Sequence, residues 1–267
     1  MGRHAVPWAE FSREGWGVTT ILDSYARDLF AYQHVFITGG TSGIGLGTAL
    51  AFRDLGATVT ATGEDHEDVE RARKDSAHDG IAFTELDVRD GKAIKACLSR
   101  FNQLDIVVNA AGVAHRDSEY DPEVFADVVA INLVGMMRIC AAAKPKLAAT
   151  KGAIVNIASM LTYVGGPRVP GYSASQGGVG QLTKSLAAAW APDGVRVNAV
   201  APGWITTPLT NTLREDKGHS QPILARTPMG RWGTSEEVAG GVVCLASPAA
   251  RFITGTILAI DGGYLAA

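Results

Sequence analysis

Short apolar runs alternate with longer helix-like stretches along most of the chain, and this alternation constrains the fold more than any other feature. The apolar runs predict strands that are hydrophobic almost throughout, as strands are when helices cover both faces of a sheet. The predicted strands are 34–39, 57–62, 81–86, 105–109, 153–158, 196–200 and 256–260. The predicted helices between them are 45–55, 67–77, 90–101, 122–147, 173–190 and 235–245.

Helical connections between successive strands predict an α/β protein with one parallel sheet. Because such crossovers are right-handed, we expect a doubly wound, seven-stranded parallel sheet with helices on both faces. No composition break or linker divides the chain, so we predict one domain over 29–267. Residues 1–28 precede the pattern and are predicted to form an N-terminal extension, partly helical around 20–30.

Composition excludes several classes of protein. With 46% apolar and 19% charged residues the chain is globular. Its 24 Lys+Arg and 27 Asp+Glu give a formal net charge of −3, and no basic run suggests a nucleic-acid or anionic-membrane partner. We see no run of about 18 apolar residues and no signal-peptide core, and therefore expect a cytoplasmic protein. Cys97, Cys140 and Cys244 have no metal-ligand spacing, so no metal site is predicted.

A glycine-rich turn separates the first predicted strand from its helix. Residues 38–45 read TGGTSGIG, with Gly39, Gly43 and Gly45 spaced as GxxxGxG. Such a turn lets a pyrophosphate approach the backbone, and the helix N-terminus directs free N–H groups at the anion. In this strand–turn–helix setting the turn predicts a nucleotide site.

Further motifs follow in order along the chain: NAAG at 109–112, Ser159, YSASQ at 172–176, Pro202-Gly203 and DGG at 261–263. Together with the glycine turn they resemble the short-chain dehydrogenase/reductase family over residues 30–267, which implies a Rossmann fold. Three segments are similar to the gluconate-type members, which oxidise or reduce deoxy-sugar acids such as 2-deoxygluconate and 2-dehydro-3-deoxygluconate. These segments are IASML at 157–161, GPRVP at 166–170 and GRWG at 230–233.

The resemblance implies a nicotinamide dinucleotide and a small-molecule substrate. It implies pyrophosphate contacts from the glycine turn, at Gly39, Thr41, Ser42, Gly43, Ile44 and Gly45. It implies that Asp87 and Val88 bind the adenine. It further implies that the remaining contacts, along the adenine ribose and over the nicotinamide, come from Asn109, Ala110, Gly112, Pro202, Gly203, Ile205 and Thr207.

The choice between NAD and NADP depends on charge near the adenosine ribose, because a 2′-phosphate requires a cation. Relatives that prefer NADP often carry a basic residue where this chain has Ser42. The acidic Glu64 follows the second predicted strand, although the residue that usually marks NAD would fall at Gly63. We expect NAD, with Glu64 in the cofactor site.

Carbonyl chemistry requires a proton donor for the oxygen and a second donor that fixes it. The resemblance implies that Tyr172 is the general acid/base, that Ser159 orients the oxygen, and that Asn132 bridges the site through water. The departure is Gln176, where family members usually have Lys one helical turn after the tyrosine. Gln can hydrogen-bond the nicotinamide ribose, with Tyr172 beside it, but it has no charge to lower the tyrosine pKa.

Three interpretations of Gln176 stay open. The first is an active oxidoreductase in which reduction suffers less than oxidation, because reduction needs a protonated Tyr172. The second is a dinucleotide-binding protein with little dehydrogenase activity. The third is an engineered replacement of a lysine.

The substrate pocket is predicted to lie between Ser159, Tyr172 and a lid over 206–232, which its Pro and Gly residues mark as irregular. Apolar candidates such as Met160, Trp204 and Leu209 favour a hydrophobic cyclic alcohol, whereas the gluconate-type resemblance favours a sugar acid held by an arginine such as Arg168. Small residues in the helices at 122–147 and 173–190 permit close packing across a two-fold axis. The resemblance implies a homotetramer, with a dimer as the alternative.

Overall fold

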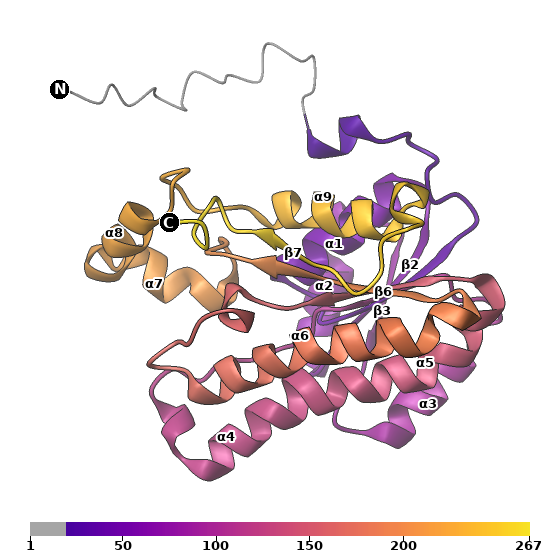
Figure 1. The fold of residues 1–267 in the computed structure, drawn as a ribbon. Helices are drawn as coiled ribbons and strands as arrows, with labels where there is room; N and C mark the ends of the chain where they lie inside the picture. Colours follow the sequence, from indigo (N-terminus) through magenta and orange to yellow (C-terminus); the bar gives the residue numbers. More distant parts are fainter. Residues whose placement is uncertain (1–19) are drawn as a thin grey trace.

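The computed structural model describes residues 20–267, and within them seven strands form one parallel sheet (Figure 1). The spatial order is β3-β2-β1-β4-β5-β6-β7, so the chain winds outward in both directions from the β1/β4 pair. The strands are β1 His34–Thr38, β2 Thr58–Gly63, β3 Ile81–Glu85, β4 Ile106–Asn109, β5 Ala153–Ile157, β6 Arg196–Pro202 and β7 Ile257–Ile260. The predicted doubly wound sheet is confirmed.

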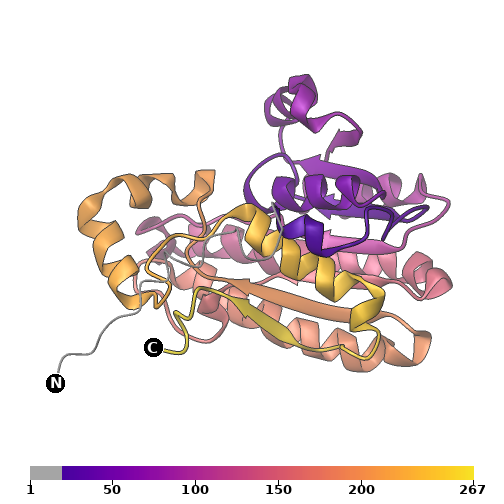
Figure 2. The ribbon, with the colours of Figure 1, turned by 90° about the horizontal axis from the view of Figure 1, so that it is seen from above.

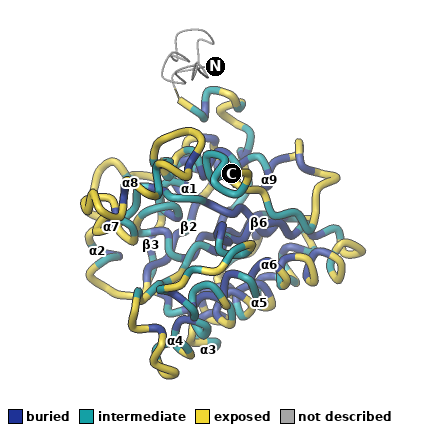
Figure 3. The backbone as a smooth tube through the Cα atoms, turned by 60° about the vertical axis from the view of Figure 1, so that its left-hand side comes forward, coloured by how far each residue is buried: buried dark blue, intermediate teal, exposed yellow. Residues whose placement is uncertain are grey.

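Helices cover both faces of this sheet and enclose two hydrophobic cores. On one face α1 and α9 pack together, with Phe52 and Val242 fully buried. On the other face α3, α5 and α6 bury residues such as Ile139 and Val179. The buried central strands stand out in Figure 3. The helices are α1 Gly43–Asp54, α2 His66–Lys74, α3 Gly91–Ser99, α4 Pro122–Val129, α5 Met136–Thr150, α6 Pro170–Trp190, α7 Asn211–Glu215, α8 Lys217–Arg226 and α9 Ser235–Ala246.

The end of the predicted N-terminal extension packs on the first of these cores. A short 3₁₀ turn at Ile21–Ser24 is the only helix in the described part of 20–30. Tyr25 Oη donates a hydrogen bond to the Gly240 carbonyl of α9 at 3.0 Å. Phe30 is fully buried, 4.8 Å from the Phe52 ring of α1. Residues 1–19 of the extension lie outside the described residues, and the boundary at 28/29 stays a prediction.

The single helix predicted over 122–147 is interrupted. A π-helical segment, Ala130–Gly135, separates α4 from α5 and contains Asn132. Such π turns are rare and occur often at functional sites. A periodicity of 3.6 residues does not reveal a local change of winding, so the sequence pattern predicted an unbroken helix.

The same helical run, Pro122–Thr150, is long and apolar enough to pass a length-and-composition test for a membrane span. Its fully buried residues Ile139, Cys140 and Leu147 pack in the core beside the sheet. A core helix of this kind passes the same test, and the packing accounts for its apolar character.

The predicted lid is more regular than its composition suggested. Within 206–232 the chain forms α7 and α8, which stand clear of the sheet at one side (Figure 2). The carboxylate of Asp216 accepts a hydrogen bond from the Gly218 N–H at 2.8 Å and so caps α8. Pro222 lies inside α8. The prediction of an irregular segment was wrong, because the capping residue outweighs the proline and glycine.

Candidate active site

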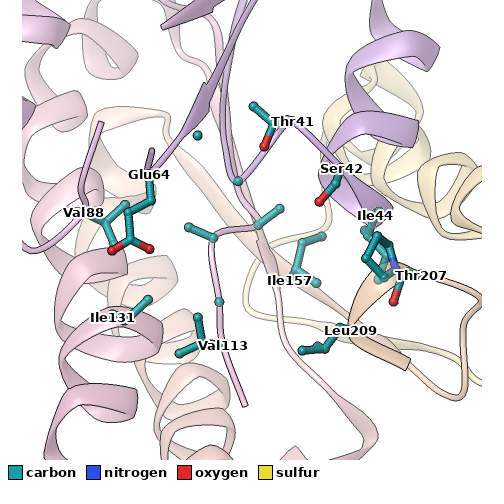
Figure 4. A pocket seen from close by; sticks show the side chains of 18 of the residues that line it. Thr41, Ser42, Ile44, Glu64, Val88, Val113, Ile131, Ile157, Thr207 and Leu209 are labelled. Carbon is teal, nitrogen blue, oxygen red and sulfur yellow. The ribbon is translucent and has the colours of Figure 1, made fainter. Parts of the chain in front are cut away.

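A cleft of about 270 Å³ opens at the carboxyl edge of the sheet, over the β1/β4 pair (Figure 4). Strand order reverses at this pair, which is where doubly wound sheets bind ligands. Segments that follow successive strands form its wall. The wall residues are Gly39, Thr41, Ser42, Gly43, Ile44, Gly45, Gly63, Glu64, Asp68, Leu86, Asp87, Val88, Ala110, Ala111, Gly112, Val113, Ile131, Ile157, Tyr172, Gln176, Thr207, Pro208 and Leu209.

The glycine turn has no room for a side chain at Gly39, Gly40 or Gly45. Gly39 has a φ of 63°, and a Cβ there would lie 2.7 Å from the backbone nitrogen of Ala111. At Gly45 a Cβ would lie 2.1 Å from the Gly39 carbonyl oxygen. The turn therefore packs directly against the start of α1 and against the segment after β4.

The N-terminus of α1 has free donors. Its cap residue Ser42 makes no side-chain capping bond, and the first turn holds no acidic residue. Leu46 N–H bonds to the Ser42 carbonyl at 3.0 Å. The N–H groups of Gly43, Ile44 and Gly45 have no hydrogen-bond partner within residues 20–267. Unpaired N–H groups and the helix dipole together form an anion site, so this turn fits a pyrophosphate.

Most of the predicted cofactor residues lie in this wall. In Figure 4, Glu64 and Val88 lie toward one side of the cleft, and Ser42, Ile44 and Thr207 toward the other. The predicted residues found in the wall are Gly39, Thr41, Ser42, Gly43, Ile44, Gly45, Glu64, Asp87, Val88, Ala110, Gly112, Tyr172, Gln176 and Thr207.

Four predicted cofactor residues lie outside the wall. The buried side chain of Asn109 donates a hydrogen bond to Asn156 Oδ1 at 2.9 Å. Pro202 ends β6, and Gly203 N–H bonds to the Ile260 carbonyl at 3.0 Å. Ile205 is buried in the first core. The sequence placed these residues near the strand ends but could not show which way each one faces.

Leu209, predicted as an apolar residue of the substrate pocket, also lies in the wall. The wall residues that were not predicted are Gly63, Asp68, Leu86, Ala111, Val113, Ile131, Ile157 and Pro208. Most of them neighbour a predicted residue at the carboxyl end of a strand. That position is the signal that could have identified them.

At one end of the cleft, which we call the charged end, Arg89 joins three carboxylates. Its Nε donates to Asp87 Oδ1 at 3.0 Å, its Nη1 donates to Asp127 Oδ1 at 3.0 Å, and its Nη2 bonds to Glu64. Burial by itself would raise the pKa of Asp87, but the hydrogen bonds and charge of Arg89 hold that pKa below its usual value. Arg138 also acts on Asp87 through its charge, so two arginines stand against three carboxylates, and negative charge is in excess at the charged end.

At the other end, which we call the neutral end, Tyr172 lies with Ser159 and Gln176. Tyr172 is the third residue of α6, Gln176 follows one turn later, and Ser159 follows β5. Burial raises the pKa of the Tyr172 phenol, hydrogen bonds with Ser159 and Gln176 oppose that rise, and the charge of Glu119 adds to it. The net effect is a raised pKa, which keeps the phenol protonated at neutral pH.

Gln176 has an unused acceptor. Its side chain is 5% exposed, and its buried Oε1 has no hydrogen-bond partner within the part of the chain that the structure describes. A buried polar atom without a partner is costly unless a ligand supplies one. Because Gln176 lines the cleft, this oxygen fits a ligand hydroxyl.

Asn132 does not line the cleft itself but hydrogen-bonds to the wall residue Val113. Its Oδ1 accepts from the Val113 N–H at 2.8 Å, and its Nδ2 donates to the Val113 carbonyl at 2.9 Å and to Ser175 Oγ at 3.2 Å. The side chain therefore joins the segment after β4 to α6. Its predicted role in a water bridge remains a prediction.

Comparison with known proteins agrees with this geometry. Residues 39–265 match a family model described as enoyl-(acyl carrier protein) reductase. The chain is 38% identical over 251 residues to 2-dehydro-3-deoxy-D-gluconate 5-dehydrogenase of Bacillus subtilis, covering 90% of this chain and 98% of that protein. It is 40% identical over 250 residues to cis-4-hydroxycyclohexanecarboxylate dehydrogenase of Sinomonas cyclohexanicum, covering 90% and 99%.

A solved structure is similar over the whole fold. The gluconate 5-dehydrogenase of Burkholderia cenocepacia, in complex with NADP and tartrate, matches with a TM-score of 0.83 at 31% identity, covering 91% of this chain and 100% of that one. Sequence motifs, sheet order, cleft and relatives thus agree. The chain belongs to the short-chain dehydrogenase/reductase family and is an oxidoreductase with the Rossmann fold of that family.

Proposed function

We propose that this chain catalyses reversible hydride transfer between a nicotinamide dinucleotide and a secondary alcohol or its ketone. The observation that carries the proposal is the hydrogen bonding of Tyr172 with Ser159 and Gln176, because Tyr172 and Gln176 line one end of the glycine-walled cleft. The relatives compared above support it, because their names are those of secondary-alcohol or sugar-acid dehydrogenases.

Tyr172 and Ser159 are the proposed catalytic side chains. In reduction the Tyr172 hydroxyl gives its proton to the carbonyl oxygen, and in oxidation the phenolate takes the proton of the alcohol. The Ser159 hydroxyl donates a hydrogen bond to the same oxygen and fixes its position. When bound, the nicotinamide supplies the hydride for reduction and accepts it in oxidation.

The residues of the cleft fit a dinucleotide. The free N–H groups at the start of α1 would hold the pyrophosphate, and Asp87 and Val88 would flank the adenine. Gln176 Oε1 would accept a hydrogen bond from a ribose hydroxyl at the neutral end. Ala110, Gly112 and Thr207 would contact the middle of the cofactor and the nicotinamide. We propose that four residues support the wall residues without contacting the cofactor: Asn109, Pro202, Gly203 and Ile205.

We propose NAD as the preferred cofactor. Arg89 lies at the charged end, where the adenosine ribose is predicted to bind, and it is already held by Glu64, Asp87 and Asp127. A 2′-phosphate would meet net negative charge there unless Arg89 left these partners. The Burkholderia relative was solved with NADP, and calorimetric affinities of this chain for NAD and NADP test the proposed preference.

We propose that the enzyme is active although Gln176 places no cation beside Tyr172. The names of the relatives favour activity over a dinucleotide-binding protein without turnover. With a neutral amide at this position and a raised Tyr172 pKa, the proton-donor form dominates at neutral pH. Reduction should therefore lose less than oxidation.

For the substrate we propose a small secondary alcohol that carries a carboxylate. The names of two relatives specify such molecules, one a sugar acid and one a hydroxylated cyclohexane acid. Apolar wall residues such as Val113, Ile157 and Leu209 suit a carbon ring. Arg168 is paired with Asp117 and His219, whereas Arg116 has no hydrogen-bond partner in the described chain. Arg116 is therefore the better candidate for the carboxylate.

The proposed function is tested by following the absorbance of reduced nicotinamide. Purified protein would be incubated with NAD and either cis-4-hydroxycyclohexanecarboxylate or gluconate, and with NADH and the matching ketones. We expect turnover of at least one pair, faster toward the alcohol at neutral pH. Dinucleotide binding by calorimetry with no turnover of any pair would contradict the proposal.

We also propose a cytoplasmic homotetramer. Exposed apolar side chains such as Val134 and Met137 on the π–α5 face, and Leu258 on the edge strand β7, suit contacts between copies. Light scattering coupled to size exclusion should give four times the 28.0 kDa chain mass, and a monomer mass would contradict this assembly.

A further inference from the structure

Glu119 is a buried carboxylate that the proposed reaction does not use. It lies in the short 3₁₀ turn Ser118–Tyr120, between β4 and α4, and is only 1% exposed. Its neighbours Ser118 and Tyr120 are exposed. Burial of a charge is costly unless hydrogen bonds compensate it, so its surroundings indicate what it does.

Both carboxylate oxygens of Glu119 accept backbone hydrogen bonds. Oε1 accepts from the His115 N–H at 2.7 Å, and Oε2 accepts from the Tyr172 N–H at 2.8 Å. Tyr172 is in the first turn of α6, where N–H groups have no partner in their own helix. The carboxylate therefore fastens the start of α6 to the loop that follows β4.

The packing around this carboxylate is close. A Cβ on Gly171 would lie 3.3 Å from Glu119 Oε2 and 3.2 Å from Cδ2 of Phe125 on α4. Ser175 Oγ donates to the Tyr172 carbonyl at 2.8 Å, so the backbone of Tyr172 is held on both sides. The absence of a side chain at Gly171 is what lets Glu119 reach the helix.

The charge of Glu119 is not cancelled by a contact ion pair within residues 20–267. Arg116, on the same loop, is close enough to interact electrostatically, but no salt bridge joins the two side chains. From α6 the backbone N–H of Tyr172 contacts Glu119, and the charge of Glu119 acts on the Tyr172 phenol. From α4 the ring of Phe125 packs beside Gly171. Ser159 and Gln176, the other partners of Tyr172, are neutral.

We infer that Glu119 is a positioning residue for Tyr172: its carboxylate fixes the start of α6 and so holds the phenol at the neutral end of the cleft. This inference rests on the proposed function. The positive end of α6 alone would favour a phenolate at Tyr172, and the Glu119 charge offsets that influence. Because Gln176 supplies no cation, the neutral end favours donation of a proton to a carbonyl, which is the direction of reduction.

Two substitutions test the contacts of Glu119 and its charge. Glu119→Gln removes the charge and, because one carboxylate oxygen becomes an NH2 donor, also one of the two backbone hydrogen bonds. Gly171→Ala keeps the charge but crowds the carboxylate. Glu123→Gln is the control, because Glu123 is exposed on the neighbouring helix. The phenolate absorbance of each protein, minus that of the same protein with Tyr172→Phe, gives the titration of Tyr172 alone among the six tyrosines.

For Glu119→Gln we expect the Tyr172 titration to move down by roughly half to one pH unit. Its kcat for ketone reduction should fall about tenfold at unchanged dinucleotide affinity, within the range of positioning effects. Gly171→Ala should lower kcat without lowering the titration midpoint. Glu123→Gln should behave as the unmodified protein does.

The inference is overturned if Glu119→Gln matches Glu123→Gln in both titration and kcat. Should Glu119→Gln fail to fold, Gly171→Ala decides alone, and an unchanged kcat overturns the positioning role. If Tyr172→Phe keeps full activity, the proposed function fails instead. The titration needs no turnover, so the charge effect of Glu119 is still measured in that case.

Discussion

The two ends of the cleft differ in how they treat charge. At the charged end Arg89 pairs with carboxylates from three different segments, and the negative charge in excess faces the predicted adenosine site. At the neutral end the Tyr172 phenol meets a hydroxyl and an amide, and within residues 20–267 the amide oxygen has no partner and no cation acts on the phenol. On the proposed function, cofactor choice would therefore depend on charge at one end, and proton transfer at the other end would use neutral groups.

The largest effect is expected at the neutral end. Replacing Tyr172 with Phe removes the proton donor, and turnover should fall at least about 1000-fold, the scale of general acid catalysis. Dinucleotide affinity by calorimetry should hold, because the charged end and the glycine turn are untouched. Tyr163→Phe, which removes an exposed phenol bonded to the Ile257 carbonyl, is the control. Equal loss in both variants would mean that the effect is not specific to Tyr172.

The next largest effect is expected from substitutions in the glycine turn, which lies between the two ends of the cleft. Gly45→Ala places a Cβ 2.1 Å from a carbonyl oxygen, so the turn must shift and dinucleotide affinity should fall about 100-fold or more. Gly177→Ala on α6 meets nothing within 4 Å. It should leave affinity unchanged and raise stability by up to about 1 kcal/mol, since Ala favours helix. Calorimetric affinity and urea midpoints check both, and similar behaviour of the two variants would contradict the fit of the cleft.

A smaller effect is expected at the charged end. Glu64→Gln removes one negative charge and frees a donor of Arg89, so affinity for NADP relative to NAD should rise roughly five- to tenfold. Raising the salt concentration should shrink the difference, since the group is exposed. Glu67→Gln, an exposed carboxylate on α2, should leave the ratio unchanged. An unchanged ratio in Glu64→Gln would remove the charge argument for NAD.

Much of the fold could be predicted from the sequence, because buried parallel strands leave continuous apolar runs. The predicted strands agree with β1 to β7 to within a residue or two at most ends. The π segment at Ala130–Gly135 could not be predicted, since its residues are apolar like the helix around them. The helices of the lid were not predicted, because Pro222 and Gly218 indicate an irregular segment and the capping role of Asp216 was not considered.

The candidate site was predictable where the local geometry admits only one residue type, as at Gly39 and Gly45 in the tight turn. It was not predictable where tertiary packing decides the role. Glu119 lies in a polar stretch typical of a surface turn, and only its contact with the start of α6 buries it. Likewise Asn109 sits at the end of its strand as expected, yet its side chain bonds to Asn156 below the cleft.

The central claim is that Tyr172 works beside a neutral Gln176, and Gln176→Lys tests it most directly. Rates of alcohol oxidation would be measured against pH for the unmodified protein and the variant. For the unmodified protein, whose Tyr172 pKa lies above the usual value of about 10, we predict oxidation that keeps rising into the alkaline range. A lysine cation should move that rise down by roughly one to three pH units and speed oxidation near neutral pH. Two superimposable profiles would contradict the account.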